Sequence, residues 1–140
     1  MLAVVDTNHL SELDRDSTLA ARFAERRRTS RIEVFVSVIS IQEIARGWLA
    51  LLNRPRKVVE QVVFYARFQR SITALRDWDI LPFDEEAADI FDSLHRSRVR
   101  IGTMDLKIAA VCIAHDATLL TRNLADFEKV PGLRVENWLD

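Results

Sequence analysis

Short apolar runs alternate with longer amphipathic stretches along the whole chain. The runs are rich in β-branched residues and too short for helices, which is typical of buried strands; they lie at residues 2–5, 34–37, 80–83 and 117–121, with an edge-like run at 133–135. Apolar residues at helical spacing occupy the segments between them. Strands that alternate with helices predict a mostly parallel sheet covered on both faces, that is, a three-layer α/β/α fold.

The helices are expected at residues 8–13, 18–28, 40–52, 57–77, 84–98 and from 103 onward. Good N-cap residues mark several of their starts, with Thr7 or Asn8 before the first helix and Thr103 before the last. Ser40 and Glu43 stand at the spacing of a capping box, so Glu43 has a structural interpretation as a cap of its own helix.

The helix expected at residues 57–77 is apolar over more than one face. A helix of this kind needs deep burial or a partner, and the helix at 40–52 is expected to join it in one apolar surface. Gly47 lies inside the latter helix and costs about 1 kcal/mol relative to alanine. We therefore expect Gly47 to pack closely against another backbone.

The chain of 140 residues is long enough for one domain with its own core, residues 1–140. Its net charge of −1 argues against nucleic-acid binding through bulk electrostatics, although basic patches beside an acidic pocket remain compatible with it. The single cysteine, Cys112, lies in an apolar helical stretch and is expected to be a core thiol. The lack of a disulfide framework, signal peptide or membrane span predicts a cytoplasmic protein.

Four acidic residues are expected at the carboxyl edge of the sheet. Asp6 follows the first strand, Glu43 lies just after the second, Asp105 opens a helix and Asp126 follows the strand at 117–121. Each also has a structural explanation as a helix cap, a dipole-favoured acid or a loop residue. Clustered carboxylates repel one another unless a cation is present, and an oxygen-only cluster suits Mg²⁺ or Mn²⁺. Such a site supports phosphodiester hydrolysis.

Two arginine clusters are candidate phosphate contacts. They comprise Arg26, Arg27 and Arg28, followed by Arg31, and Arg96, Arg98 and Arg100. The functional interpretation is contact with phosphates, and the structural one is a set of solvated cations at helix C-termini. The three histidines, His9, His95 and His115, show no metal-ligand spacing and are interpreted as incidental.

Four motifs in register resemble those of PIN-domain ribonucleases. They are Leu-Ala-Val-Val-Asp6-Thr7-Asn8, Ser40-Ile41-Gln42-Glu43-Ile44 with Gly47, Ile101-Gly102 through Asp105 to Ala109-Ala110, and Leu120-Thr121-Arg122-Asn123 with Asp126-Phe127. The tail from Val130-Pro131-Gly132 to Trp138 is also similar. The motifs span nearly the whole chain, and the likeness is greatest to the VapC toxins of bacterial toxin–antitoxin pairs, with their FitB-like relatives.

The resemblance implies a single PIN domain with Mg²⁺-dependent endoribonuclease activity. Asp6, Glu43 and Asp105 match the family's acidic triad, and Asp6 and Asp105 would be the direct metal ligands. The fourth acid is assigned to Asp126, while Asn123 stands where some members carry an acid. A supporting polar shell of Thr7, Thr121 and Asn123 would hold the carboxylates through hydrogen bonds.

The implied partners are an RNA substrate, a cognate VapB-type antitoxin and a second copy of the chain. In the family an antitoxin tail fills the acidic groove, often with an arginine near the carboxylates. The apolar helices at 39–52 and 57–75 are the candidates for that groove.

Two rival functions belong to other classes. The first is a catalytically inactive PIN-fold module that binds RNA or protein; loss of the acids would be expected there, whereas all triad positions are filled. The second is a phosphoryl-aspartate protein with Asp6 as the nucleophile. A phosphatase of that kind has a second acid two positions later, where this chain has Asn8, and the paired acids and late lysine of a receiver are also missing.

Overall fold

Five parallel strands form a single sheet in the computed structural model, which describes residues 1–140. The strands are β1 (Leu2–Val5), β2 (Glu33–Ser37), β3 (Asp79–Leu81), β4 (Ala117–Leu120) and β5 (Val135–Glu136). Their order is β3-β2-β1-β4-β5, and every neighbouring pair is parallel. The mostly parallel sheet predicted from the apolar runs is therefore confirmed, with the β-branched run of β1 at its centre.

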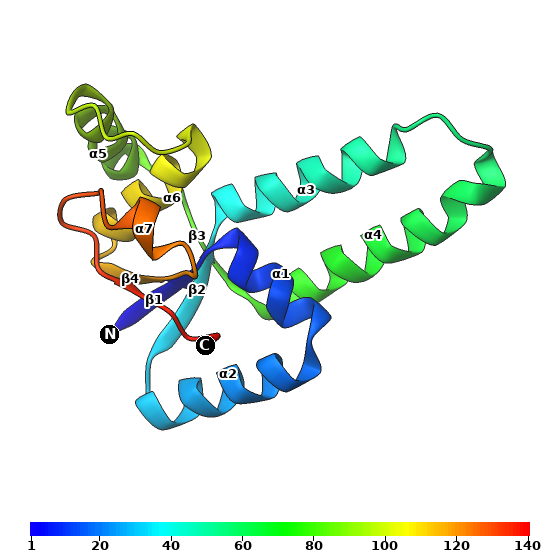
Figure 1. Ribbon diagram of the computed structural model, residues 1–140, viewed down its shortest axis with the longest axis horizontal. Helices are drawn as coiled ribbons and strands as arrows, with labels where there is room; N and C mark the ends of the chain where they lie inside the picture. The colour runs from blue at the N-terminus through cyan, green and yellow to red at the C-terminus, as the bar shows by residue number, and fades with distance from the viewer.

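The helices connect successive strands (Figure 1). They are α1 (Thr7–Arg15), α2 (Ser17–Ser30), α3 (Val38–Leu52), α4 (Val62–Ala74), α5 (Glu85–Arg96), α6 (Thr103–Ala114) and the short α7 (Leu124–Phe127). Two 3₁₀ segments, η1 (Val58–Gln61) and η2 (Leu75–Asp77), flank α4, so the single long helix expected at 57–77 is divided into three pieces. None of these helices is long and apolar enough to cross a lipid bilayer.

Alternate residues of β1 separate two apolar cores, one on each face of the sheet. Val4 belongs to the larger core, which the buried residues of α6 dominate, whereas Ala3 and Val5 belong to the smaller core under α1 and α2. Phe23 of α2 packs there against Trp138, with ring centroids 5.4 Å apart. Period-two alternation in a central strand thus produces the predicted α/β/α layers.

The helix starts differ in detail from the capping residues predicted. The N-cap of α1 is Asp6, and neither Thr7 nor Asn8 takes this role. The Asp6 carboxylate accepts a hydrogen bond from the His9 N–H of the first turn. Gly102 occupies the N-cap position of α6, and Thr103 is the first helical residue. Helices α1 and α6 therefore both begin earlier than their predicted N-caps indicate. Helix ends commonly differ by one or two residues from such expectations.

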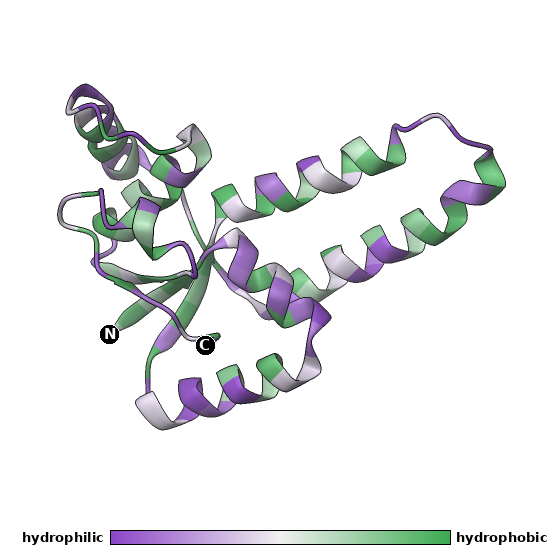
Figure 2. Cartoon of the chain, viewed as in Figure 1, coloured by the Kyte–Doolittle hydropathy of each residue, from purple (hydrophilic) through white to green (hydrophobic).

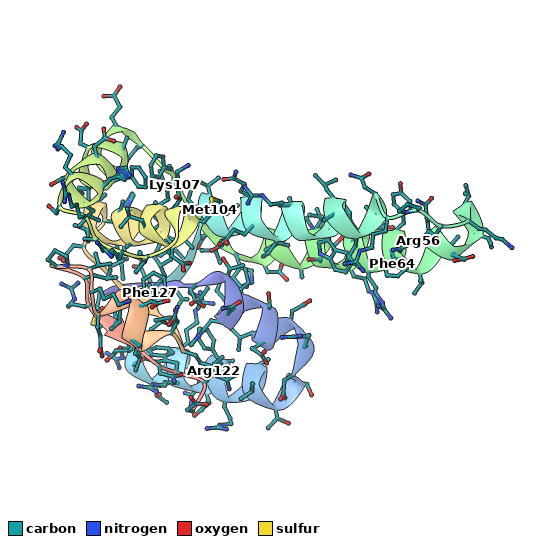
Figure 3. The ribbon with its side chains drawn as sticks, turned by 45° about the horizontal axis from the view of Figure 1, so that its top comes forward. Arg56, Phe64, Met104, Lys107, Arg122 and Phe127 are labelled. Carbon is teal, nitrogen blue, oxygen red and sulfur yellow. The ribbon has the colours of Figure 1, made fainter.

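Helices α3 and α4 run side by side away from the sheet and form a helical arm (Figure 1). Trp48 of α3 stacks on Phe68 of α4 with an interplanar angle of 4°. Near the tip, the Arg56 guanidinium lies 4.0 Å from the centroid of the Phe64 ring (Figure 3). The arm carries apolar residues on its outer surface as well (Figure 2), so the wide apolar arc seen in the sequence is only partly buried within the chain.

Candidate functional site

The carboxyl ends of β1 and β4 meet at the point where the chain reverses its direction of travel across the sheet. From β1 the chain moves to β2 and β3 on one side, and later to β4 and β5 on the other. Ligands of open α/β sheets bind in the crevice at such a switch point. Asp6 directly follows β1 and Thr121 directly follows β4, so both residues lie at this crevice.

Asp6 has a buried carboxylate, and each of its two oxygens accepts a hydrogen bond. The backbone N–H of His9 donates to Oδ1 at 2.7 Å, and the Thr121 hydroxyl donates to Oδ2 at 2.5 Å. Burial raises the pKa of Asp6 most, and the negative charge of Glu43 raises it further, although the bonds from Thr121 and His9 oppose this shift. Asp6 is therefore a rigid, poorly solvated carboxylate that gains from a nearby cation.

Glu43 lies in the second turn of α3 and faces α1. The Thr7 hydroxyl donates a hydrogen bond to its Oε1 at 2.6 Å and is also 3.0 Å from the Ser40 Oγ. The capping-box interpretation of Ser40 and Glu43 is wrong, because α3 begins at Val38 and its N-cap is Ser37, which accepts from the Ser40 N–H. Glu43 is thus held by a neighbouring helix and is left free of any role at its own helix end.

Asp105 is the point on which the other three acids act together. It lies in the first turn of α6 and is half-buried. Burial raises its pKa most, and the charges of Glu43, Asp6 and Asp126 each raise it further. The charges of three carboxylates from other segments of the chain therefore act on Asp105.

Asp126 differs from the other three acids because one of its direct partners is a lysine. Asn123 donates from Nδ2 to Oδ2 at 3.0 Å, and the Lys129 ammonium lies 3.4 Å from Oδ1. These two interactions lower the pKa of Asp126. The Asn123 N–H in turn donates to the Thr121 hydroxyl at 2.9 Å, so a hydrogen-bonded chain links Asp126 to Asp6.

Two residues of this region were given no site role in the sequence. Ser40 is fully buried beside Thr7, and His9 is fully buried with its Nδ1 3.8 Å from the Asp6 Oδ1. Neither ring nitrogen of His9 has a hydrogen-bond partner. Burial and then the positive charge of Arg122 lower the His9 pKa to about 4, so the ring is neutral at pH 7. Only spacing in the sequence could have indicated His9. A residue three positions after the N-cap lies close to the N-cap, because a helical turn has 3.6 residues.

The donor set fits a hard divalent cation by its chemistry. Asp6, Glu43 and Asp105 offer only oxygen ligands, and the neutral His9 is the only basic side chain within ion-pair distance of any of them. The spacing is wider than in an assembled site, since no three His, Cys, Asp or Glu side chains come close enough together to hold a metal ion. Oxygen-rich, uncompensated carboxylates suit Mg²⁺ or Mn²⁺ better than zinc.

The two arginine clusters occupy different parts of the molecule. Helix α2 leads into the start of β2, so Arg26, Arg27 and Arg28 lie toward the amino edge of the sheet. Arg28 pairs with Glu25 at 2.7 Å, and Arg26 lies over the Trp138 ring. Arg96 is instead the last residue of α5 and Arg98 lies two residues beyond it, in the short connection to α6, whose first turn contains Asp105.

A groove of about 1040 Å³ adjoins the acidic cluster and is bounded by α1, α2, α3 and the α4–η2 junction. Thr7 and Glu43 line it where it meets the site, and Leu13, Phe23 and Trp48 are among its apolar walls. The helices predicted to form an apolar groove therefore contribute only their inner residues to it, together with α1 and α2.

Comparison with known proteins agrees with this fold. The PIN domain family profile matches residues 3–133. Ribonuclease VapC1 of Rickettsia felis is 29% identical over 136 residues, which are 94% of this chain and 92% of the relative. Toxin FitB of Neisseria gonorrhoeae is 34% identical over 100 residues, or 68% of each chain.

A solved structure of VapBC2 from Rickettsia felis, bound to a DNA fragment from their promoter, shares the fold. Its TM-score is 0.76 at 23% identity, and the match covers 99% of both chains. The identification made from the four motifs is thus confirmed, and the chain belongs to the PIN-domain family, with the VapC ribonucleases and toxin FitB among its relatives.

Proposed function

We propose that this protein is a Mg²⁺-dependent endoribonuclease that acts as the toxin of a VapBC-type toxin–antitoxin pair. The observation that carries the proposal is the convergence of negative charge on Asp105, whose pKa is raised first by burial and then by Glu43, Asp6 and Asp126. Repulsion between the carboxylates destabilises the folded chain, and a divalent cation bound among them removes this destabilisation. Relatives named ribonucleases supply the expected chemistry.

Asp6 and Asp105 would hold the ion, which is Mg²⁺ or Mn²⁺. The bound ion supplies positive charge for the phosphate oxygens and lowers the pKa of an attacking water. Thr121 and the His9 N–H fix the orientation of Asp6, and Thr7 fixes one oxygen of Glu43. The other oxygen of Glu43 remains available to orient water or accept its proton. Asp126, already paired with Asn123 and Lys129, supports Asp105 by charge.

The test is cleavage of a 5′-labelled single-stranded RNA by purified protein with Mg²⁺ or EDTA. Asp6→Asn and Asp105→Asn are each expected to lower the rate more than about 100-fold, since metal stabilisation of the transition state supplies several kcal/mol. Asp92→Asn, on the exposed face of α5, is the matched control and should cleave normally. Full metal-dependent cleavage by Asp6→Asn would overturn the nuclease mechanism.

An inactive PIN-fold module that binds RNA or protein is the second candidate. The observation in its favour is the wide spacing of the acids, of which no three are arranged to hold an ion. A Mg²⁺ titration in which thermal unfolding is measured at each concentration distinguishes the two functions. A Tm that rises with Mg²⁺ in the wild type, and is insensitive to it in Asp105→Asn, favours the nuclease.

We further propose that an antitoxin segment occupies the groove beside the acids and blocks RNA from the site. The groove is largely apolar, and Glu43 belongs both to its lining and to the acidic cluster. A basic side chain of the segment would compensate the unpaired carboxylates there. Co-purification with the small protein encoded by the adjacent reading frame, and loss of RNA cleavage in that complex, are the expected results.

A second copy of the chain is proposed to cover the outer surface of the arm. Eight of the ten exposed large apolar residues lie on α3, η1 and α4, and the exceptions are Met1 and Ile80. Val58, Val59 and Val62 are 80%, 74% and 64% exposed. An exposed apolar surface of this kind is typical of an interface in a folded protein.

A further inference from the structure

Gly47 has no reason within the chain to be glycine. It lies in the interior of α3, five residues before the helix ends at Leu52, where glycine is unfavourable relative to alanine. Its φ is not positive, because Gly132 is the only glycine in the left-handed region. A Cβ built at Gly47 would meet no atom within 4 Å, so the close backbone contact predicted from the sequence is wrong.

The vacant position at Gly47 faces the groove. Gly47 is among the residues that line it, with Ile44 three residues before and Leu51 four residues after on the same face of α3. Glu43 lies one helical turn away, about 6 Å along the axis. At Gly47 the helix backbone of α3 is therefore not covered by a side chain, between the apolar part of the groove and the carboxylates.

The chemistry of the groove favours a polypeptide occupant over RNA. Twelve of the 23 lining residues are hydrophobic, and the three lining acids, Asp14, Glu43 and Asp77, balance the three arginines. An RNA strand needs a net positive track for its phosphates, which this groove does not provide. A peptide would instead bury apolar side chains against residues such as Phe23 and Leu51 and extend to Glu43 with a cation.

We propose that the backbone of the antitoxin segment crosses α3 at Gly47, in van der Waals contact with the helix, and that the absent side chain is what admits it. This inference rests on the proposed function, since it concerns the same partner and the same groove. Glycine residues at helix crossings allow two backbones to approach more closely than any side chain permits. The helix is thus less stable in the free chain and complementary to its partner in the complex.

The test uses Gly47→Ala and Gly47→Leu with the full-length chain, and the probe is the small protein encoded by the adjacent reading frame. Both variants are expected to raise the Tm of the free chain, the alanine by about 3–5 °C, because helix propensity improves and nothing is displaced. The Kd for the probe should weaken by about 5–10-fold for alanine and more than about 100-fold for leucine, from overpacking at the contact. Ala50→Leu, exposed on α3 and outside the groove lining, should bind normally.

The outcomes separate this inference from the proposed function. If the wild-type chain does not bind the probe, the antitoxin proposal fails and this inference fails with it. If the wild type binds and both Gly47 variants bind equally well, the antitoxin proposal stands and the role of Gly47 is overturned. A selective loss of RNA binding, or a change in self-association instead of antitoxin binding, would also overturn it in favour of another occupant.

Discussion

The hydroxyl of Thr121 donates a 2.5 Å hydrogen bond to the Asp6 Oδ2 across 115 positions of sequence. The bond joins the ends of the adjacent strands β1 and β4, which pair in parallel up to Val5 and Leu120. The Asp6 N–H donates to the Leu120 carbonyl directly beside it. The orientation of the carboxylate is therefore a consequence of strand register, and it does not depend on a flexible loop.

Thr121→Val should remove this bond with little change in shape. Because the bond lowers the pKa of Asp6, the pKa should rise further, and the unpaired buried carboxylate should cost about 1–3 kcal/mol of unfolding free energy at pH 7. The Mg²⁺ affinity should fall by about 10–100-fold, as expected for loss of a partner that orients a ligand. Urea unfolding and a Mg²⁺ titration measure these effects, and Thr121→Ser, which keeps the hydroxyl, should restore most of both.

His9 should make the metal-free protein less stable in acid. Its folded pKa of about 4 lies below the unfolded value of 6.5, so the unfolded state binds the proton first as the pH falls. The destabilisation should begin below pH 6.5 and reach roughly 3 kcal/mol near pH 4. His9→Leu, which cannot titrate, should lack this part of the pH dependence.

The control for His9 is the difference between the two proteins over the same pH range. Asp6 acts in the opposite direction, because its raised folded pKa adds stability as the pH falls toward 3.8. Subtracting the His9→Leu unfolding curve from that of the wild type removes the contribution of Asp6. Equal slopes for the two proteins between pH 6.5 and 4 would contradict the assignment.

The sequence predicts the strands and their shared carboxyl edge better than the local contacts there. Alternating apolar runs place Asp6, Glu43, Asp105 and Asp126 at one edge through topology alone, because parallel strands end on the same side. The side-chain partners were less predictable. Glu43 matches a capping-box pattern, yet its partner Thr7 is 36 positions away and reaches it only after the sheet has formed.

Gly47 and the arm show a second limit of local reasoning. A glycine in a helix indicates close contact, but the sequence does not say whether the contact lies inside the chain or with another molecule. The wide apolar arc of α4 raises the same question, and its outer residues remain exposed in the single chain. Patterns that concern a partner are visible in one sequence only as features that the fold leaves unexplained.

The two arginine clusters should differ in their effect on RNA binding. Neutralising Arg96 and Arg98, near the Asp105 end of α6, should weaken RNA binding and reduce the salt slope by about 1 to 2 units. The same number of substitutions at Arg27 and Arg28, toward the amino edge, should change the slope little. Fluorescence anisotropy at several salt concentrations makes the comparison, and slopes unchanged from the wild type in both double variants would indicate that neither cluster contacts the RNA backbone.

Substitution of the arm surface should separate folding from self-association. Val59→Ser and Val62→Ser replace side chains that are 74% and 64% exposed, so each should change the unfolding free energy by no more than about 0.5 kcal/mol. Both lie on the outer surface proposed to bury against a second copy, so the double variant should weaken the dimer more than about tenfold. Sedimentation velocity over a concentration series measures this weakening of the dimer.

Ile80→Thr, at an exposed position of the edge strand β3, is the matched control, because it also removes exposed apolar area but lies off the arm. A monomeric wild type, or an equal loss of dimer in Ile80→Thr, would show that the arm is not the self-association surface.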